Sequence, residues 1–217
     1  MRLKTPYTNL QKGREDGADS MIEIVLATSN PHKVDEINSV SMPLGVKFTL
    51  PDKGFNPIED GTTFEENAYA KALAAAQCEK SGRKYFMADD SGLCVDFLNG
   101  APGLKSARYA PSTEKRIEKL LNALKDVKDA HRGAKFVCSL VLADKMGKIL
   151  NKTFGICKGT IAHKECGQGG FGYDPIFIVE NKNMTMAQLS EDEKNLVSHR
   201  GRALMDMLMW IKCSDLK

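Results

Sequence analysis

Short apolar blocks separated by polar segments recur along the chain and predict strands. The first block, IEIVLATSN at residues 22–30, is rich in β-branched residues and ends in small polar ones, which is typical of a buried strand. Comparable blocks lie at 46–50, 84–90, 134–144 and 148–162, and a shorter one ends the segment 166–179. The two longest blocks flank a turn at 145–148, which predicts a hairpin.

Longer segments with helical spacing predict helices between these strands. Asn30 and Pro31 form a suitable cap and first position for a helix that follows the first strand directly. The alanine-rich segment 62–81 is the clearest helix, with Thr62 or Thr63 as its cap. Two further helices are expected, at 112–127 with a cap at Ser112 or Thr113, and across 185–211, where Ser190 and Ser198 are alternative caps.

The order of these elements predicts the α/β class. Strands and helices alternate at first and a hairpin follows, which indicates a mixed sheet with flanking helices, arranged as two lobes around a central cleft. Residues 21–217 contain no repeat or linker and are expected to form a single domain. Residues 1–20 are polar and are expected to be a mobile N-terminal extension without a secretory signal.

Composition narrows the possible partners. A net charge of +3 is too weak for a nucleic-acid-binding protein, although it permits one local basic site for a small polyanion. The six cysteines form no CxxC pair and have no zinc-like spacing, so we expect reduced thiols and a cytoplasmic location. The sequence contains no apolar segment of the roughly 18 residues that a membrane span needs.

The turn TSNPHK, residues 28–33, is the first candidate for chemistry. A strand that turns directly into a helix exposes the helix N–H groups, which bind phosphate. Lys33 in the first helical turn opposes the helix dipole, and a bound phosphate would explain it. The alternative is an ordinary helix cap with a solvated lysine.

Two adjacent aspartates, Asp89 and Asp90, are the second candidate, together with Glu59 from an earlier loop. The pair stands where the apolar block at 84–90 ends, so a strand end is expected there. Carboxylates are the ligands that Mg²⁺ prefers, and a carboxylate can also orient a water for attack on phosphorus. The alternative is a solvated turn.

Two polar segments near the C-terminus complete the candidates. The glycine-rich loop GGFGYD, 169–174, can approach a ligand closely, and Phe171 or Tyr173 could stack on a base or could instead anchor the loop in the core. Lys194, His199 and Arg200 place three donors close together, or they form a solvated polar face.

These motifs, in this order, resemble the inosine-triphosphate pyrophosphatase family. The resemblance runs from about residue 21 to 210 through VLATSNPHKVDEI, TFEENAYAKA, ADDSGLCVDFLNGAPGLKSARYA, GGFGYDPIF and EKNLVSHRGRAL. It implies an elongated mixed α/β fold with two lobes and a homodimer. It also implies Mg²⁺-dependent hydrolysis of ITP, dITP and XTP to the monophosphate and pyrophosphate.

The resemblance also implies roles for individual residues. Asp90 matches the proton acceptor and metal ligand, and Ser91 matches a substrate contact. The family's triphosphate loop matches Thr28, Ser29, Asn30, Pro31, His32 and Lys33. Its base-binding loop matches Phe171, Gly172, Tyr173 and Asp174. Its remaining substrate contacts match Lys194, His199 and Arg200.

The sequence departs from the family pattern at two places. Ser29 replaces the glycine of the family's TGN. The segment PIEDG replaces an EETG-like segment that supplies a metal ligand, so the second metal ligand here is Glu59 or, failing that, Asp60. Which of Asp89 and Asp90 acts as base stays open. Rival interpretations are a Maf-like pyrophosphatase acting on other nucleotides and a nucleotide sensor without turnover.

Overall fold

A computed structural model describes residues 21–216, and the expected extension at 1–20 lies outside them. Six strands form one mixed sheet in the order β2-β1-β3-β4-β5-β6. Their bounds are Ile22–Leu26 for β1, Val46–Thr49 for β2, Tyr85–Val95 for β3, Gly133–Asp144 for β4, Ile149–Ile161 for β5 and Phe177–Val179 for β6. The mixed α/β class with flanking helices is confirmed, as is the hairpin, which is β4–β5.

The pairing of the strands leaves room beside β3. β1 is parallel to both of its neighbours, whereas β3, β4, β5 and β6 pair antiparallel. β1 pairs with β3 only from Tyr85 to Met87, while β4 pairs with β3 along its whole length to Val95. The part of β3 that follows Met87 therefore lies beyond the end of β1.

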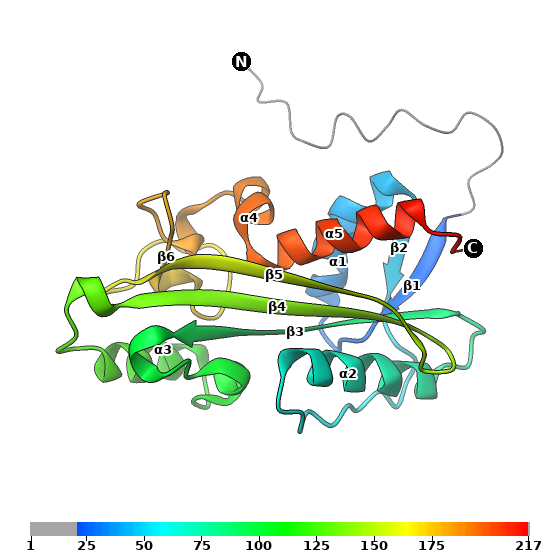
Figure 1. The fold of residues 1–217 in the computed structure, drawn as a ribbon, viewed down its shortest axis with the longest axis horizontal. Helices are drawn as coiled ribbons and strands as arrows, with labels where there is room; N and C mark the ends of the chain where they lie inside the picture. The colour runs from blue at the N-terminus through cyan, green and yellow to red at the C-terminus, as the bar shows by residue number, and fades with distance from the viewer. Residues whose placement is uncertain (1–20, 217) are drawn as a thin grey trace, which may run out of the picture.

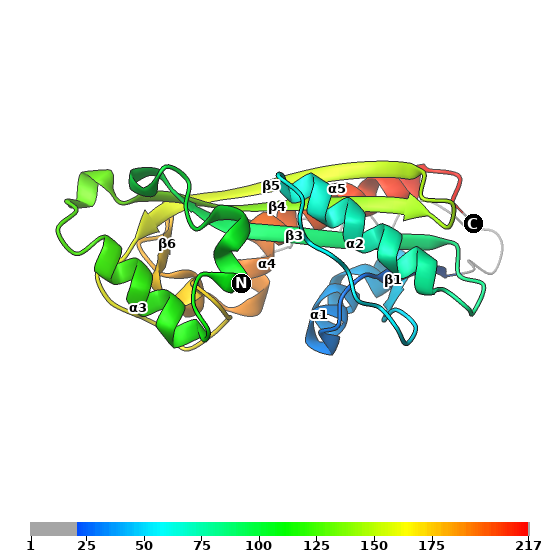
Figure 2. The same cartoon turned by 90° about the horizontal axis from the view of Figure 1, so that it is seen from below.

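The helices divide the molecule into two lobes. Figures 1 and 2 show an elongated molecule whose long strands β3, β4 and β5 run through both ends. At one end, α1 (Pro31–Ser41) and α5 (His199–Cys213) pack on one face of the sheet, and α2 (Phe64–Cys78) packs on the other. At the other end, α3 (Thr113–Ala123) packs with β6 around a separate apolar cluster, and α4 (Glu191–Val197) precedes α5.

Local capping explains where the helices begin. Thr63 caps α2 in a capping box with Glu66, and the Ser112 hydroxyl accepts a hydrogen bond from the backbone N–H of Lys115. Ser190 caps α4 and Ser198 caps α5, so both alternative caps near the C-terminus are used. Consequently His199 and Arg200 occupy the first turn of α5. No helix within residues 21–216 combines the length and apolarity needed to cross a membrane.

The prediction that a strand ends at Asp90 is wrong. β3 continues to Val95 because each of its residues from Tyr85 onward is paired with β4. Asp89 and Asp90 therefore lie in mid-strand, where successive side chains point to opposite faces of the sheet. This alternation, rather than a shared strand end, sets the environment of each carboxylate.

Candidate functional site

A cavity of about 310 Å³ lies where the two lobes meet, beside the part of β3 that β1 leaves uncovered. It collects most of the residues that the motifs single out, which are Lys33, Glu59, Asp90, Ser91, Phe171, Gly172, Tyr173, Asp174, Lys194, His199 and Arg200. Asp89 also lines it. Segments more than 100 residues apart in the sequence thus meet at one place.

Only part of the predicted phosphate-binding turn at residues 28–33 lines the cavity. Lys33 lines the cavity, whereas Thr28 and residues 29–31 follow the end of β1 and are half-buried or exposed. The side chain of His32 is outside the described set. The unusual position of Lys33 has a structural cause, because its Nζ lies 2.9 Å from Asp89 Oδ1.

Asp89 is a buried carboxylate held between two cations. Besides Lys33, the Nη2 and Nε atoms of Arg200 lie 3.1 and 3.3 Å from Asp89 Oδ2. Only 4% of the residue is exposed. Burial acts to raise the pKa of Asp89, but Lys33, Arg200 and Lys71 outweigh it and hold the pKa well below its usual range. Asp89 is therefore an ionised structural anchor with little capacity to accept a proton.

Asp90 points to the opposite face, toward α2. Its Oδ1 lies 2.8 Å from Lys71 Nζ, and its Oδ2 accepts a hydrogen bond from Asn67 Nδ2 at 3.2 Å. Burial raises the pKa of Asp90, opposed by Lys71 and Asn67. A raised carboxyl pKa suits a proton acceptor, so the geometry favours Asp90 over Asp89 as the base.

Glu59 approaches Asp90 through Lys71. The Lys71 Nζ lies 3.3 Å from Glu59 Oε1, and Arg108 Nη1 lies 3.6 Å from Glu59 Oε2. Asp60 is exposed and lies outside the cavity lining, so the position of Glu59 favours it as the second ligand.

The donors present suit a metal ion that is shared with a substrate. Within residues 21–216 no group of three or more His, Cys, Asp or Glu side chains is arranged to hold a metal. Mg²⁺ usually takes one or two carboxylates and completes its shell with water and substrate phosphates. Glu59 and Asp90 provide that number of ligands, so the residues fit Mg²⁺ bound together with a phosphate.

In the loop at 171–174, the structure distinguishes the two aromatic residues, either of which could have stacked on a base or anchored the loop. Phe171 lines the cavity and is 54% exposed, whereas Tyr173 is buried and its hydroxyl donates to the Ser106 carbonyl at 3.0 Å. Phe171 is thus available for stacking, and Tyr173 anchors the loop. Asp174 fixes the loop further, because its Oδ2 accepts from the Phe171 N–H and lies 2.8 Å from Lys194 Nζ.

His199 and Arg200 reach the cavity from the first turn of α5. The His199 ring stacks on Phe136, and its Nδ1 is buried without a hydrogen-bond partner among the described residues. Burial and the neighbouring Arg200 hold the pKa of His199 well below its usual range, so the ring is neutral. The Arg200 guanidinium lies 5.4 Å from the centre of the Phe171 ring. Arg200 thus lies beside the exposed Phe171 ring, and His199 lines the same cavity while its ring packs on the buried Phe136.

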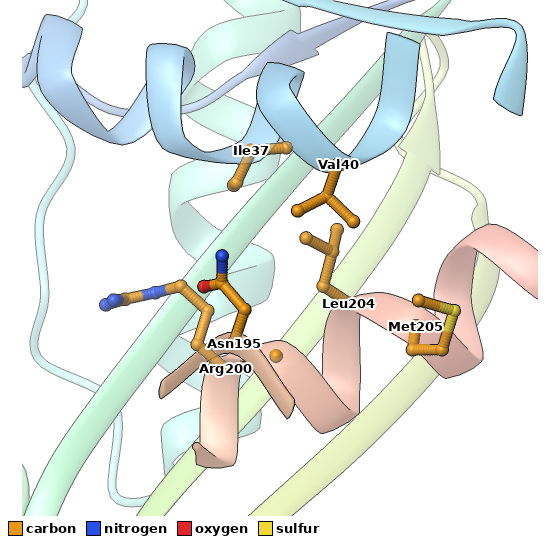
Figure 3. A pocket seen from close by; sticks show the side chains of 7 residues that line it. Ile37, Val40, Asn195, Arg200, Leu204 and Met205 are labelled. Carbon is orange, nitrogen blue, oxygen red and sulfur yellow. The ribbon is translucent and has the colours of Figure 1, made fainter. Parts of the chain in front are cut away.

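The position of α5 is set by tight packing against β5 and by its neighbour α1. A Cβ atom at Gly155 of β5 would lie 1.9 Å from the His199 carbonyl oxygen, so the helix touches the strand directly. Beside it on the same face of the sheet, Ile37 and Val40 of α1 face Leu204 (Figure 3) across a crevice of only about 10 Å³. In Figure 3 the guanidinium of Arg200 points away from this crevice.

The motif analysis did not single out Lys71. It lies on the buried face of α2 together with Ala68, Ala72 and Ala75. A charged residue at a core-facing position of an amphipathic helix is a recognisable signal, because a buried lysine needs an anionic partner. That partner, Asp90, comes from β3 and could not be identified before the packing of α2 on the sheet was known.

The fold and the cavity define a two-lobed α/β protein with a charged, aromatic-edged cleft between its lobes. The model of the Ham1 family matches residues 24–210, and the chain belongs to this family. A relative from Synechocystis, named dITP/XTP pyrophosphatase, is 44% identical over 188 residues, covering 87% of this chain and 94% of the relative. A Bacillus subtilis protein of the same name is 45% identical over 190 residues, covering 85% and 94%.

Solved structures agree with this assignment. A HAM1 protein from Coxiella burnetii is 40% identical and superposes with a TM-score of 0.79, covering 89% of this chain and 100% of that one. A nucleoside-triphosphatase, also titled dITP/XTP pyrophosphatase, from Mycobacterium abscessus is 38% identical with a TM-score of 0.69, covering 86% and 98%. The family resemblance drawn from the motifs is confirmed.

Proposed function

We propose that the protein hydrolyses noncanonical purine nucleoside triphosphates, namely ITP, dITP and XTP, to the monophosphate and pyrophosphate. The observation that carries this proposal is a single cavity that combines carboxylates, lysines and an exposed aromatic ring. Relatives that match most of the chain are named for activity on dITP and XTP. Hydrolysis of these nucleotides would remove them from the pool before they enter DNA or RNA.

In this proposal, one group of cavity residues acts on the triphosphate and another group binds the base. Lys33 and Lys71 supply positive charge for the triphosphate, and Asp90 orients a water and accepts its proton while the bond between the α- and β-phosphates breaks. Bound Mg²⁺, held by Asp90 and Glu59, would neutralise charge on the phosphates. Phe171 stacks on the base, and His199 and Arg200 contact its edge.

Several further properties belong to the same proposal. We expect Mg²⁺ as the metal, a homodimer as the assembly, residues 21–217 as one catalytic domain and the cytoplasm as the location. Ser91, which lines the cavity, and residues 28–32, which directly precede the cavity-lining Lys33, are proposed as additional substrate contacts.

The test is a panel of nucleoside triphosphates assayed with and without Mg²⁺, with the products followed by phosphorus NMR. Release of pyrophosphate from ITP, dITP and XTP, strongly dependent on Mg²⁺, is the expected result. Formation of IDP and orthophosphate would refute the proposed reaction. A preference for UTP or dTTP would favour a Maf-like activity, and binding of ITP without turnover would indicate a nucleotide sensor.

A further inference from the structure

The ammonium group of Lys71 lies between the two carboxylates that are proposed to hold the metal. Its distances are 2.8 Å to Asp90 Oδ1 and 3.3 Å to Glu59 Oε1. Its side chain is only 11% exposed and extends from the buried alanine face of α2. Lys71 is thus a bridging cation inside the cleft rather than a solvated lysine.

The other carboxylates that line the cavity are also paired, but in a different way. Asp89 is shared by Lys33 and Arg200, and Asp174 is paired with Lys194. Among the described residues that line the cavity, Lys71 is the cation that joins two carboxylates from separate segments. Two carboxylates brought together repel each other, and a cation between them offsets that repulsion.

A divalent cation bound by the same two carboxylates would compete with this ammonium. Each group would occupy the space between Glu59 and Asp90, and two positive charges at such short range repel. The lysine side chain has a flexible four-carbon stem, so its charge can move to another anion without movement of the helix. A triphosphate in the cavity would provide such an anion.

We propose that Lys71 is an internal counter-ion that keeps the metal site closed until a triphosphate draws its ammonium away from Glu59 and Asp90. This inference rests on the proposed function, because it takes the same two carboxylates as the metal ligands. It predicts that metal and nucleotide bind cooperatively, since each favours the arrangement in which Lys71 has left the carboxylates. The free protein would then bind divalent metal weakly.

The experiment measures Mn²⁺ binding without nucleotide, by electron paramagnetic resonance of the free ion. Lys71→Met keeps a long side chain on the apolar face of α2 but removes the charge, and we expect it to bind Mn²⁺ at least ~10-fold more tightly than wild type, because the repulsion between ammonium and metal is gone. Arg108→Met is the matched control. It also removes a cation beside Glu59, but from a side chain that is 57% exposed and does not bridge the carboxylates. Its Mn²⁺ affinity should stay within about 3-fold of wild type, because an exposed charge is screened by solvent.

Lys71→Arg retains the positive charge on a side chain of different shape. It should therefore keep the weak Mn²⁺ binding of wild type. Equal Mn²⁺ affinity in wild type and Lys71→Met would overturn the inference. An equal gain in Arg108→Met or Lys71→Arg would also overturn it, since the effect would then not depend on a bridging charge. Wild-type turnover of ITP is measured separately, so failure of the proposed reaction leaves the metal-binding result interpretable.

Discussion

Gly155→Ala tests whether the packing of β5 against α5 positions His199 and Arg200, the proposed base contacts. The new methyl group would lie 1.9 Å from the His199 carbonyl oxygen and 2.9 Å from the Ala203 nitrogen. Both neighbours are backbone atoms of α5, so a rotamer change cannot relieve the overlap. The backbone of Gly155 is outside the left-handed region, so the effect is steric.

The size of the effect follows from the available space. A carbon–oxygen contact of 3.0 Å or more requires α5 to move by at least about 1 Å. Ile37 and Val40 of α1 lie beside α5 on the same face of the sheet and leave a crevice of only about 10 Å³, so α5 has little room to shift sideways. Overpacking of this kind costs about 1–3 kcal/mol. A displacement of about 1 Å at a reacting site lowers rates by up to ~100-fold.

We therefore expect Gly155→Ala to lower kcat/KM for ITP by roughly 10- to 100-fold. The melting temperature should fall by about 2–4 °C for each kcal/mol lost. Activity is measured by pyrophosphate release, well below the melting temperature of the variant. Gly159→Ala is the control, because its Cβ would lie 2.1 Å from the Ile178 carbonyl oxygen of β6 and meets no backbone atom of α5. The reasoning is refuted if Gly155→Ala retains half of the wild-type kcat/KM, or if Gly159→Ala loses as much activity.

Three further predictions concern the charged residues of the cavity. Asp90→Asn should lower kcat by at least ~100-fold with an unchanged circular dichroism spectrum, because an amide cannot accept the proton; a variant that keeps a tenth of kcat would exclude Asp90 as base. Arg200→Ala should reduce kcat/KM far more for ITP, whose 6-oxo group accepts a hydrogen bond, than for ATP; an equal loss on both would show that Arg200 does not select the base. His199 is neutral in the fold with a depressed pKa, whereas in the unfolded chain it takes up a proton near the ordinary histidine pKa of 6.5. Wild-type stability should therefore fall by about 1.4 kcal/mol per pH unit below that value, and His199→Gln should lose this slope in urea unfolding between pH 6.5 and 5; identical slopes would contradict the assignment.

Local signals in the sequence were sufficient to predict most of the secondary structure. The capping residues Thr63, Ser112, Ser190 and Ser198 bond to backbone groups within a few residues, so their effect can be inferred without knowledge of the rest of the fold. The β4–β5 hairpin is similarly local, since its strands are adjacent in sequence and joined by a short turn. The motifs also identified the family and most of the cavity-lining residues.

The length of β3 was decided by tertiary structure. The polar residues and glycine of ADDSG favour a turn when considered alone. Pairing with β4, which begins 38 residues after β3 ends, continues the strand through this segment to Val95. Tertiary context overrides local preference here, because the paired strand satisfies the backbone hydrogen bonds along the whole segment.

The different environments of Asp89 and Asp90 could be recognised only from the tertiary structure. The sequence places Asp89 and Asp90 side by side, but the pleat of the strand sends one toward Lys33 and Arg200 and the other toward Lys71. These cations come from α1, α5 and α2, which approach β3 from different directions. A pKa depends on the charges within a few ångströms and on burial, and neither quantity is set by the neighbouring residues in sequence. The sequence alone thus identified most of the residues that line the cavity, whereas the packing of the helices on the sheet decided that Asp89 pairs with Lys33 and Arg200 and that Asp90 pairs with Lys71.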